Sequence, residues 1–163
     1  MLQGRQSMKI KLLILDVDGT LTDGGIYYGS DGTEYKRFCA QDGAGIIAAE
    51  RAGVEFVIMT ARESPVVLRR AQDLNIRHVY QDVHDKKERL RELMAELELV
   101  SEDVAYFGDD TIDLEAMSLC SFVGCPCNAC KEVKAASDYV SPYEGGHGAV
   151  RDILEYMAEQ KMF

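Results

Sequence analysis

The chain has 163 residues, of which 47% are hydrophobic, and a formal net charge of -10. This length suits one domain with a substantial core, and so acidic a chain is a poor candidate for binding nucleic acid or an anionic membrane, which both need a basic face. No apolar run approaches the ~20 residues of a membrane span, and residues 1–8 lack the apolar core of a signal peptide. Five cysteines, an odd number, suit a reducing cytoplasm better than a disulfide framework.

The first predicted element is a buried strand at residues 10–15, because a short apolar run there is bounded by charged residues. The run ends at Asp16, and Asp18, Gly19 and Thr20 follow it. Strands of an open α/β sheet present their ligands at their carboxyl ends. We therefore expect two carboxylates at a functional edge of a single domain that spans residues 9–163. Residues 1–8 are expected to be a disordered leader.

A hairpin is predicted next. Residues 26–28 and 33–38 are rich in aromatic and β-branched types and flank a turn of Gly, Ser and Asp at residues 29–32. The composition is too polar for a core element. We expect a β-hairpin flap over about residues 24–41, projecting from the carboxyl end of the first strand.

The rest of the chain alternates between helical and extended patterns. Helices are predicted at residues 44–51, 65–74, 86–97, 112–119, 129–136 and 149–162, with Ser64 as an N-cap and Pro65 at the first helical position. Strands are predicted at residues 54–59, 76–80, 104–107, 122–123 and 139–140. Such alternation indicates an α/β fold with a doubly wound, Rossmann-like parallel sheet.

Polar side chains lie at the ends of four predicted strands, and parallel strands bring these ends to one edge. They are Asp16 with Asp18, Thr60, Lys86 and the pair Asp109 and Asp110. Carboxylates so close together repel one another, and a hard cation with oxygen ligands, Mg²⁺ in the presence of phosphate, relieves that repulsion.

The same residue types are suited to phosphoryl transfer. Asp16 could attack phosphorus, and Asp18 could protonate the leaving alkoxide and later deprotonate water. Lys86 and the Thr60 hydroxyl suit the oxygens of the transferred group.

This pattern resembles that of the haloacid dehalogenase superfamily phosphatases, with its DxDGT motif at residues 16–20. The resemblance implies that Asp16 is the nucleophile, Asp18 the acid/base, and Thr60 and Lys86 the phosphate binders. It implies Mg²⁺ ligation by Asp16, the Asp18 carbonyl and Asp109, with Gly108 and Asp110 in support.

The chain lacks room for the cap domain that many relatives insert, because residues 61–85 hold only one helix and one strand. Capless members close their sites with neighbouring subunits or act on large substrates. The flap sequence at residues 25–46 and the tail at residues 145–154 resemble the 3-deoxy-D-manno-octulosonate 8-phosphate (KDO 8-phosphate) phosphatases. That resemblance implies a cytoplasmic Mg²⁺-dependent sugar-acid phosphatase that forms an aspartyl-phosphate. It also implies a homotetramer with shared active sites, in which the tail reaches a neighbour's site.

Three residues are predicted to bind substrate: Arg62, Arg70 and Asp42. By resemblance, Arg70 binds the sugar-acid carboxylate. Members that act on the nine-carbon KDN 9-phosphate carry glutamate in place of Arg62 and lysine near Asp73, and this chain has neither. The eight-carbon substrate is therefore favoured.

The alternatives are one other substrate and two other functions. KDN 9-phosphate remains a second substrate, because Ala61 and Thr20 depart from the family pattern. A non-catalytic oligomerisation module and a phospho-acceptor signalling domain are disfavoured, since both Asp16 and Asp18 are present.

Four cysteines lie close together in the sequence: Cys120, Cys125, Cys127 and Cys130. They could form a four-thiolate zinc site. Free thiols are favoured, because the family has a strand, a turn and a helix here with small residues in these places.

Overall fold

The computed structural model describes residues 9–163, so the predicted leader at residues 1–8 lies outside the described residues. Six parallel strands form one sheet in the order β5-β4-β1-β6-β7-β8, which confirms the predicted fold class. The strands are β1 (Leu12–Leu15), β4 (Glu55–Met59), β5 (His78–Tyr80), β6 (Val104–Phe107), β7 (Phe122–Cys125) and β8 (Tyr139–Val140). The helices are α1 (Ala40–Arg51), α2 (Pro65–Asp73), α3 (Lys86–Glu96), α4 (Leu114–Met117), α5 (Lys131–Ala136) and α6 (Ala149–Glu159).

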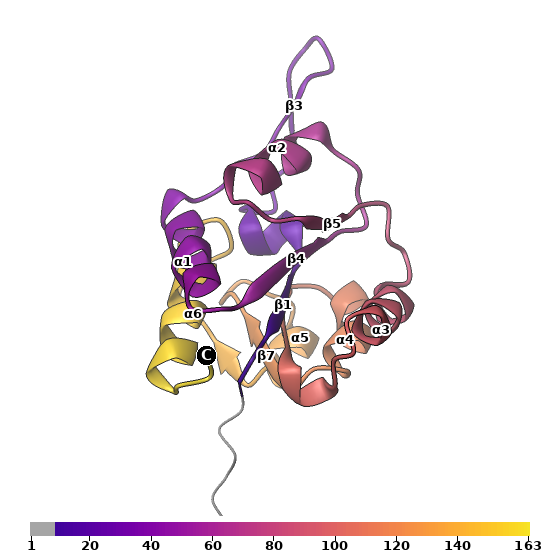
Figure 1. Cartoon of the computed structure of the whole chain (residues 1–163). Helices are drawn as coiled ribbons and strands as arrows, with labels where there is room; N and C mark the ends of the chain where they lie inside the picture. The colour runs from indigo at the N-terminus through magenta and orange to yellow at the C-terminus, as the bar shows by residue number, and fades with distance from the viewer. Residues whose placement is uncertain (1–8) are drawn as a thin grey trace, which may run out of the picture.

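Side chains of β1 alternate between two hydrophobic cores. Leu13 and Leu15 pack on the face covered by α1, α2 and α6, whereas Leu12 and Ile14 pack on the face covered by α3, α4 and α5. Figure 1 shows α1 and α6 on one side of the sheet and α3, α4 and α5 on the other. All four β1 side chains are fully buried, and each contributes about 1.5–3 kcal/mol by leaving water. This double burial explains why β1 is a continuous apolar run.

The winding of the sheet reverses beside β1. From β1 the chain passes outward to β4 and β5, then crosses to β6 on the other side of β1 and continues to β7 and β8. In open α/β sheets, ligands bind at the carboxyl ends of the strands where the winding reverses. We therefore expect the functional site at the residues that follow β1 and β6.

The hairpin after β1 consists of β2 (Tyr27–Tyr28) and β3 (Glu34–Tyr35), which pair antiparallel. It projects beyond the body of the molecule (Figure 1). Its strands are shorter than predicted, and Phe38 pairs instead with Thr22. The flap was predicted over about residues 24–41, and α1 begins at Ala40 rather than at the predicted Ala44. An acidic residue in the first turn, Asp42, favours a helix start here.

Two other helix starts also differ from the prediction. The helix predicted at residues 112–119 is a tight turn at Thr111–Asp113 followed by the short α4, because the Asp110 carboxylate caps the turn through the Thr111 N–H. Ser64 precedes α2 with Pro65 at its first position, but its hydroxyl makes no capping hydrogen bond. Within residues 9–163, no helix is long and apolar enough to cross a bilayer.

Candidate active site

The loop after β1 holds Asp16 at the reversal of winding. Its N–H donates to the Phe107 carbonyl at 3.0 Å, which ties the loop to β6, and the residue is only 6% exposed. Gly19 follows with φ +92°, and a Cβ there would lie 2.0 Å from Asp109 Oδ2. Both the backbone angle and the close approach require glycine at this position. The loop therefore brings the carboxylates of two distant strand ends together.

Lys86 enters the site from the first turn of α3, where Asp85 caps the helix by accepting the Glu88 N–H at 2.9 Å. Its Nζ lies 2.7 Å from Asp16 Oδ1 and 2.7 Å from Asp113 Oδ1, and its side chain is 1% exposed. Burial lowers the pKa of Lys86, but the attraction of Asp16 and Asp113 outweighs burial and raises that pKa overall. The lysine is thus a charged ammonium at neutral pH.

Asp113 is a central residue that the sequence analysis missed. It is fully buried, and its Oδ1 accepts from Lys86 and from the Tyr106 hydroxyl, each at 2.7 Å. Its Oδ2 accepts the N–H groups of Asp109 and Asp110 at 3.2 and 3.3 Å. Asp113 therefore shapes the loop after β6 and anchors Lys86. The signal in the sequence was a third acidic residue, three positions after the Asp109 and Asp110 pair.

The carboxylates form a site that fits a divalent cation. Ligand oxygens of Asp16, Asp109 and Asp113 lie within 4.8 Å of one another. Burial, then the like charge of Asp113, raises the pKa of Asp16 well above its ordinary value, although Lys86 opposes this; burial also raises the pKa of Asp109. One ammonium does not balance three carboxylates, so a hard cation with oxygen ligands would relieve the excess charge. Asp113 already accepts four hydrogen bonds, so of the three carboxylates Asp16 and Asp109 are the more available to a cation.

A hollow of about 160 Å³ opens in front of these groups. Its lining brings together seven of the predicted site residues, with two neighbours: Asp16, Asp18, Thr60, Arg62, Lys86, Asp109 and Asp110, with Ala61 and Ile112. Gly108 is buried at the end of β6 directly before Asp109. A larger hollow of about 270 Å³ lies at the other end of β4, between Glu50 and Arg77, away from this cluster of charges. The polar strand ends thus converge as the sequence predicted.

Comparison with known proteins decides the family. The sequence profile of haloacid dehalogenase-like hydrolases matches residues 75–154. The 3-deoxy-D-manno-octulosonate 8-phosphate phosphatase of Escherichia coli is 39% identical over 148 residues, which cover 91% of this chain and 79% of that protein. The chain belongs to the KDO 8-phosphate phosphatase family of haloacid dehalogenase-like hydrolases. It is therefore a phosphoric monoester hydrolase by family.

Solved structures of such phosphatases have the same fold. The Moraxella catarrhalis enzyme, whose crystal structure contains magnesium, phosphate and KDO, is 42% identical, with a TM-score of 0.91 over 95% of this chain and 90% of that one. The Yersinia pestis enzyme is 36% identical, with a TM-score of 0.90 over 96% of this chain and 85% of that one.

Of the three predicted substrate-binding residues in this phosphatase, only Arg62 lines the hollow. Its side chain is 42% exposed, and Nη2 lies 2.8 Å from Glu34 Oε1 in the hairpin. That hairpin carboxylate thus holds the arginine at the rim of the site.

Arg70 and Asp42 do not line the hollow. The Arg70 guanidinium lies 5.5 Å from the centre of the Phe38 ring and donates to the Cys39 carbonyl at 3.1 Å. Asp42 is 1% exposed, and its Oδ1 accepts the Arg151 N–H at 2.9 Å in the first turn of α6. Within one chain, these contacts connect the flap to α2 and α1 to α6.

The glycine-rich tail of the phosphatase lies against the loop that follows β1 in the same chain. A Cβ on Gly145 would lie 2.0 Å from the Gly19 carbonyl oxygen, and the Gly146 N–H donates to the Thr20 carbonyl at 3.3 Å. Arg37 donates from the flap side to the Gly146 carbonyl. Within one chain the tail therefore supports this loop, and its contact with a neighbour's site stays a prediction.

The cysteines in the segment around β7 are free thiols. Among the described residues, the three aspartates are the one group of three or more His, Cys, Asp or Glu ligands whose donor atoms lie within 4.8 Å of one another. Burial raises the pKa of Cys120 to about 12 and also raises that of Cys125. The thiols thus lack the convergence that a four-thiolate zinc site requires.

Proposed function

We propose that this protein is a Mg²⁺-dependent phosphatase that hydrolyses KDO 8-phosphate through an aspartyl-phosphate intermediate. The observation that carries the proposal is the contact of Asp16 with Lys86 in a hollow lined by further carboxylates. The identity of 36–42% with KDO 8-phosphate phosphatases, one of them crystallised with magnesium, phosphate and KDO, supports the substrate.

The roles of the residues follow from their positions. Asp16 attacks phosphorus, and Asp18 protonates the leaving oxygen and then takes a proton from the water that hydrolyses the aspartyl-phosphate. Lys86 and the buried Thr60 at the end of β4 hold oxygens of the transferred group. Mg²⁺ bound by Asp16, Asp109 and the Asp18 carbonyl would screen the phosphate dianion from the attacking carboxylate.

Arg62 is the cation best placed to meet the sugar-acid carboxylate, because it lines the hollow and is partly exposed. The contacts of Arg70 and Asp42 favour structural roles for these two residues within one chain. A neighbouring subunit that approaches the flap would change the surroundings of Arg70, which lies against Phe38.

We further propose a cytoplasmic homotetramer of one-domain chains without a cap. The hairpin carries exposed apolar side chains, and such a patch is typical of an interface. The exposed apolar side chains of the hairpin are Ile26 (56% exposed), Tyr27 (45%), Tyr28 (67%) and Tyr35 (57%). A flap contributed by each neighbour would close the open hollow and exclude water from it. The five free cysteines fit a reducing compartment.

The experiment that tests the function is phosphate release by the purified full chain in the presence of Mg²⁺. We expect kcat/KM for KDO 8-phosphate to exceed that for KDN 9-phosphate and for neutral sugar phosphates by roughly tenfold or more, which corresponds to about 1.4 kcal/mol or more of differential transition-state binding. Chelation should abolish turnover, and added Mg²⁺ should restore it. Absence of turnover with every phosphate ester would overturn the proposal. A higher kcat/KM for KDN 9-phosphate would mean that the nine-carbon sugar acid is the substrate instead.

A further inference from the structure

Lys36 reaches the active site from the hairpin, although neither the sequence motif nor the reaction described above gives it a role. It directly follows β3, and its Nζ lies 2.6 Å from Asp18 Oδ1. The Lys36 side chain is 2% exposed, whereas that of Asp18 is 25% exposed. Lysine is rarely buried to this degree unless it is paired. The contact is therefore built into the fold and is unlike an ordinary surface ion pair.

A second carboxylate holds Lys36 in place. Glu34 Oε1 lies 3.6 Å from Lys36 Nζ and 2.8 Å from Arg62 Nη2, so one oxygen interacts with both cations. Charges of alternating sign thus run from Asp18 through Lys36 and Glu34 to Arg62. Since Asp18 and Arg62 both line the hollow, the hairpin is connected to two of its walls.

This arrangement restricts the Asp18 carboxyl group. The side chain sits on the loop after β1 near two other carboxylates, Asp16 and Asp109, which repel it. An ammonium only donates hydrogen bonds, so Lys36 holds Oδ1 as an acceptor. Within residues 9–163 no hydrogen bond reaches Asp18 Oδ2, and this oxygen stays available to a bound substrate.

We propose that Lys36 is a positioning residue that orients the Asp18 carboxyl group for proton transfer to the leaving oxygen. The inference rests on the proposed function, since it takes Asp18 as the group that donates the proton. As the bond from Asp16 to phosphorus forms and the ester P–O bond breaks, the proton on Asp18 Oδ2 moves to the departing oxygen. Asp18 regains a proton from the water that later hydrolyses the aspartyl-phosphate. A carboxyl group free to rotate would spend less time in the productive geometry.

The test compares Lys36→Met with the wild type on aryl phosphates of similar size that differ in leaving-group acidity, from phenyl phosphate to 4-nitrophenyl phosphate. For each substrate kcat/KM is measured, because it covers the steps up to release of the phenol and leaves out the later hydrolysis. A poor leaving group needs the proton, whereas 4-nitrophenolate leaves without it. We expect Lys36→Met to lower kcat/KM roughly 10- to 100-fold for phenyl phosphate and less than about threefold for 4-nitrophenyl phosphate.

Two further variants sharpen the comparison. Lys36→Arg keeps a charged donor and should restore most of the kcat/KM for phenyl phosphate that Lys36→Met loses. Lys11→Met removes a lysine that pairs with Asp103 at 2.8 Å outside the hollow, and all its rates should match the wild type. If Lys36→Met does not fold, Lys36→Gln gives the same comparison without the charge.

An equal loss for all aryl phosphates would overturn the inference, because it would mean that Lys36 only maintains the hairpin. Unchanged rates for all of them would overturn it as well. If the wild type itself hydrolyses no phosphate ester, the proposed function fails instead, and the two failures are therefore distinguishable.

Discussion

Asp16 and Asp113 share the Lys86 ammonium, and the different surroundings of the two carboxylates predict different effects of substitution. Asp16→Asn keeps the shape of the side chain but cannot attack phosphorus. We expect kcat to fall by roughly 10⁴-fold or more, with an unchanged circular dichroism spectrum. Asp73→Asn, which alters an exposed pair with Arg69, is the control and should leave kcat unchanged. Appreciable turnover by Asp16→Asn would exclude the covalent mechanism.

Asp113 should matter for stability as well as activity. Asp113→Ala removes the acceptor for a buried ammonium, a buried hydroxyl and two backbone N–H groups. We expect a loss of about 3–5 kcal/mol in the free energy of unfolding, because a buried charge loses a partner. Tyr106→Phe removes only one of these hydrogen bonds and should cost about 1 kcal/mol. Urea unfolding of both variants measures the difference, and equal losses would contradict this account of Asp113.

At the scale of elements, the contact between the tail and the catalytic loop predicts an effect on activity. Gly145→Ala would place a Cβ 2.0 Å from the Gly19 carbonyl oxygen and displace the loop that carries Asp18. Relief of this clash needs a shift of about 1 Å, and a shift of that size in a catalytic group should lower kcat by about 100-fold.

Gly53→Ala serves as the matched control for Gly145→Ala. Gly53 has φ +107° with open space around its Cα, far from the hollow. Alanine there should cost about 1–2 kcal/mol of stability and leave kcat unchanged. If both variants behave alike in steady-state kinetics and thermal unfolding, the tail does not support the loop.

The segment around β7 predicts a pattern of thiol reactivity. With a pKa of about 12, Cys120 carries almost no thiolate at pH 8. Burial also raises the pKa of Cys125, which lowers its thiolate fraction. We expect both to resist iodoacetamide in the native protein while the half-buried Cys39, Cys127 and Cys130 are modified first. Mass spectrometry of peptides after short exposure measures this order, with urea-unfolded protein as the reference in which all five react. Stoichiometric zinc in the purified protein would contradict the absence of a thiolate site.

The sequence predicted those features that depend on burial and chain order. Strands buried on both faces appear as apolar runs, and parallel pairing brings their polar ends together, so Asp16, Thr60 and Asp109 could be assigned to one edge. Asp113 and Lys36 were missed because their roles depend on contacts across 27 and 18 residues, which periodicity does not record. The predicted start of α1 was wrong because the pair Asp42 and Gly43, which is typical of a turn, lies instead in the first turn of the helix.

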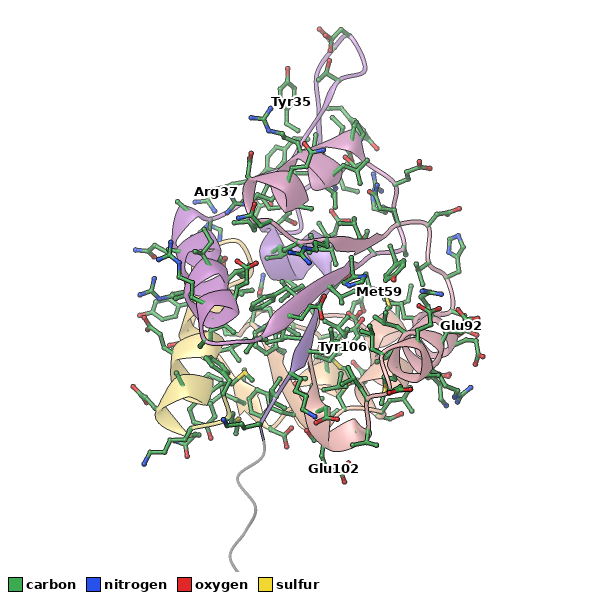
Figure 2. The ribbon with its side chains drawn as sticks, in the orientation of Figure 1. Tyr35, Arg37, Met59, Glu92, Glu102 and Tyr106 are labelled. Atoms are coloured by element: carbon green, nitrogen blue, oxygen red, sulfur yellow. The ribbon has the colours of Figure 1, made fainter. Side chains whose placement is uncertain are left out.

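At the scale of the whole molecule, the projecting hairpin predicts the state of assembly. Figure 2 shows Tyr35 on the hairpin and Glu102 at the opposite end of the molecule. The double substitution Tyr28→Ser with Tyr35→Ser removes two exposed rings, 67% and 57% exposed, and should convert a tetramer to smaller species. Val100→Ser, 58% exposed and near Glu102, is the control and should leave the mass in light scattering unchanged. A wild-type monomer with full activity would remove both the interface and the shared site.

The contact of Gly145 and Gly146 with the loop at Gly19 and Thr20 joins two segments that lie far apart in the sequence and are therefore synthesised at different times. The helix that follows, α6, packs its buried Ile153 and Leu154 into the same core as β1. Contacts between residues so far apart in the sequence form late, after the intervening strands have paired in the sheet. A nascent chain that has released Asp16 and Lys86 but not yet α6 therefore lacks the contact that supports the loop after β1. Phosphatase activity should appear only after α6 has left the ribosome.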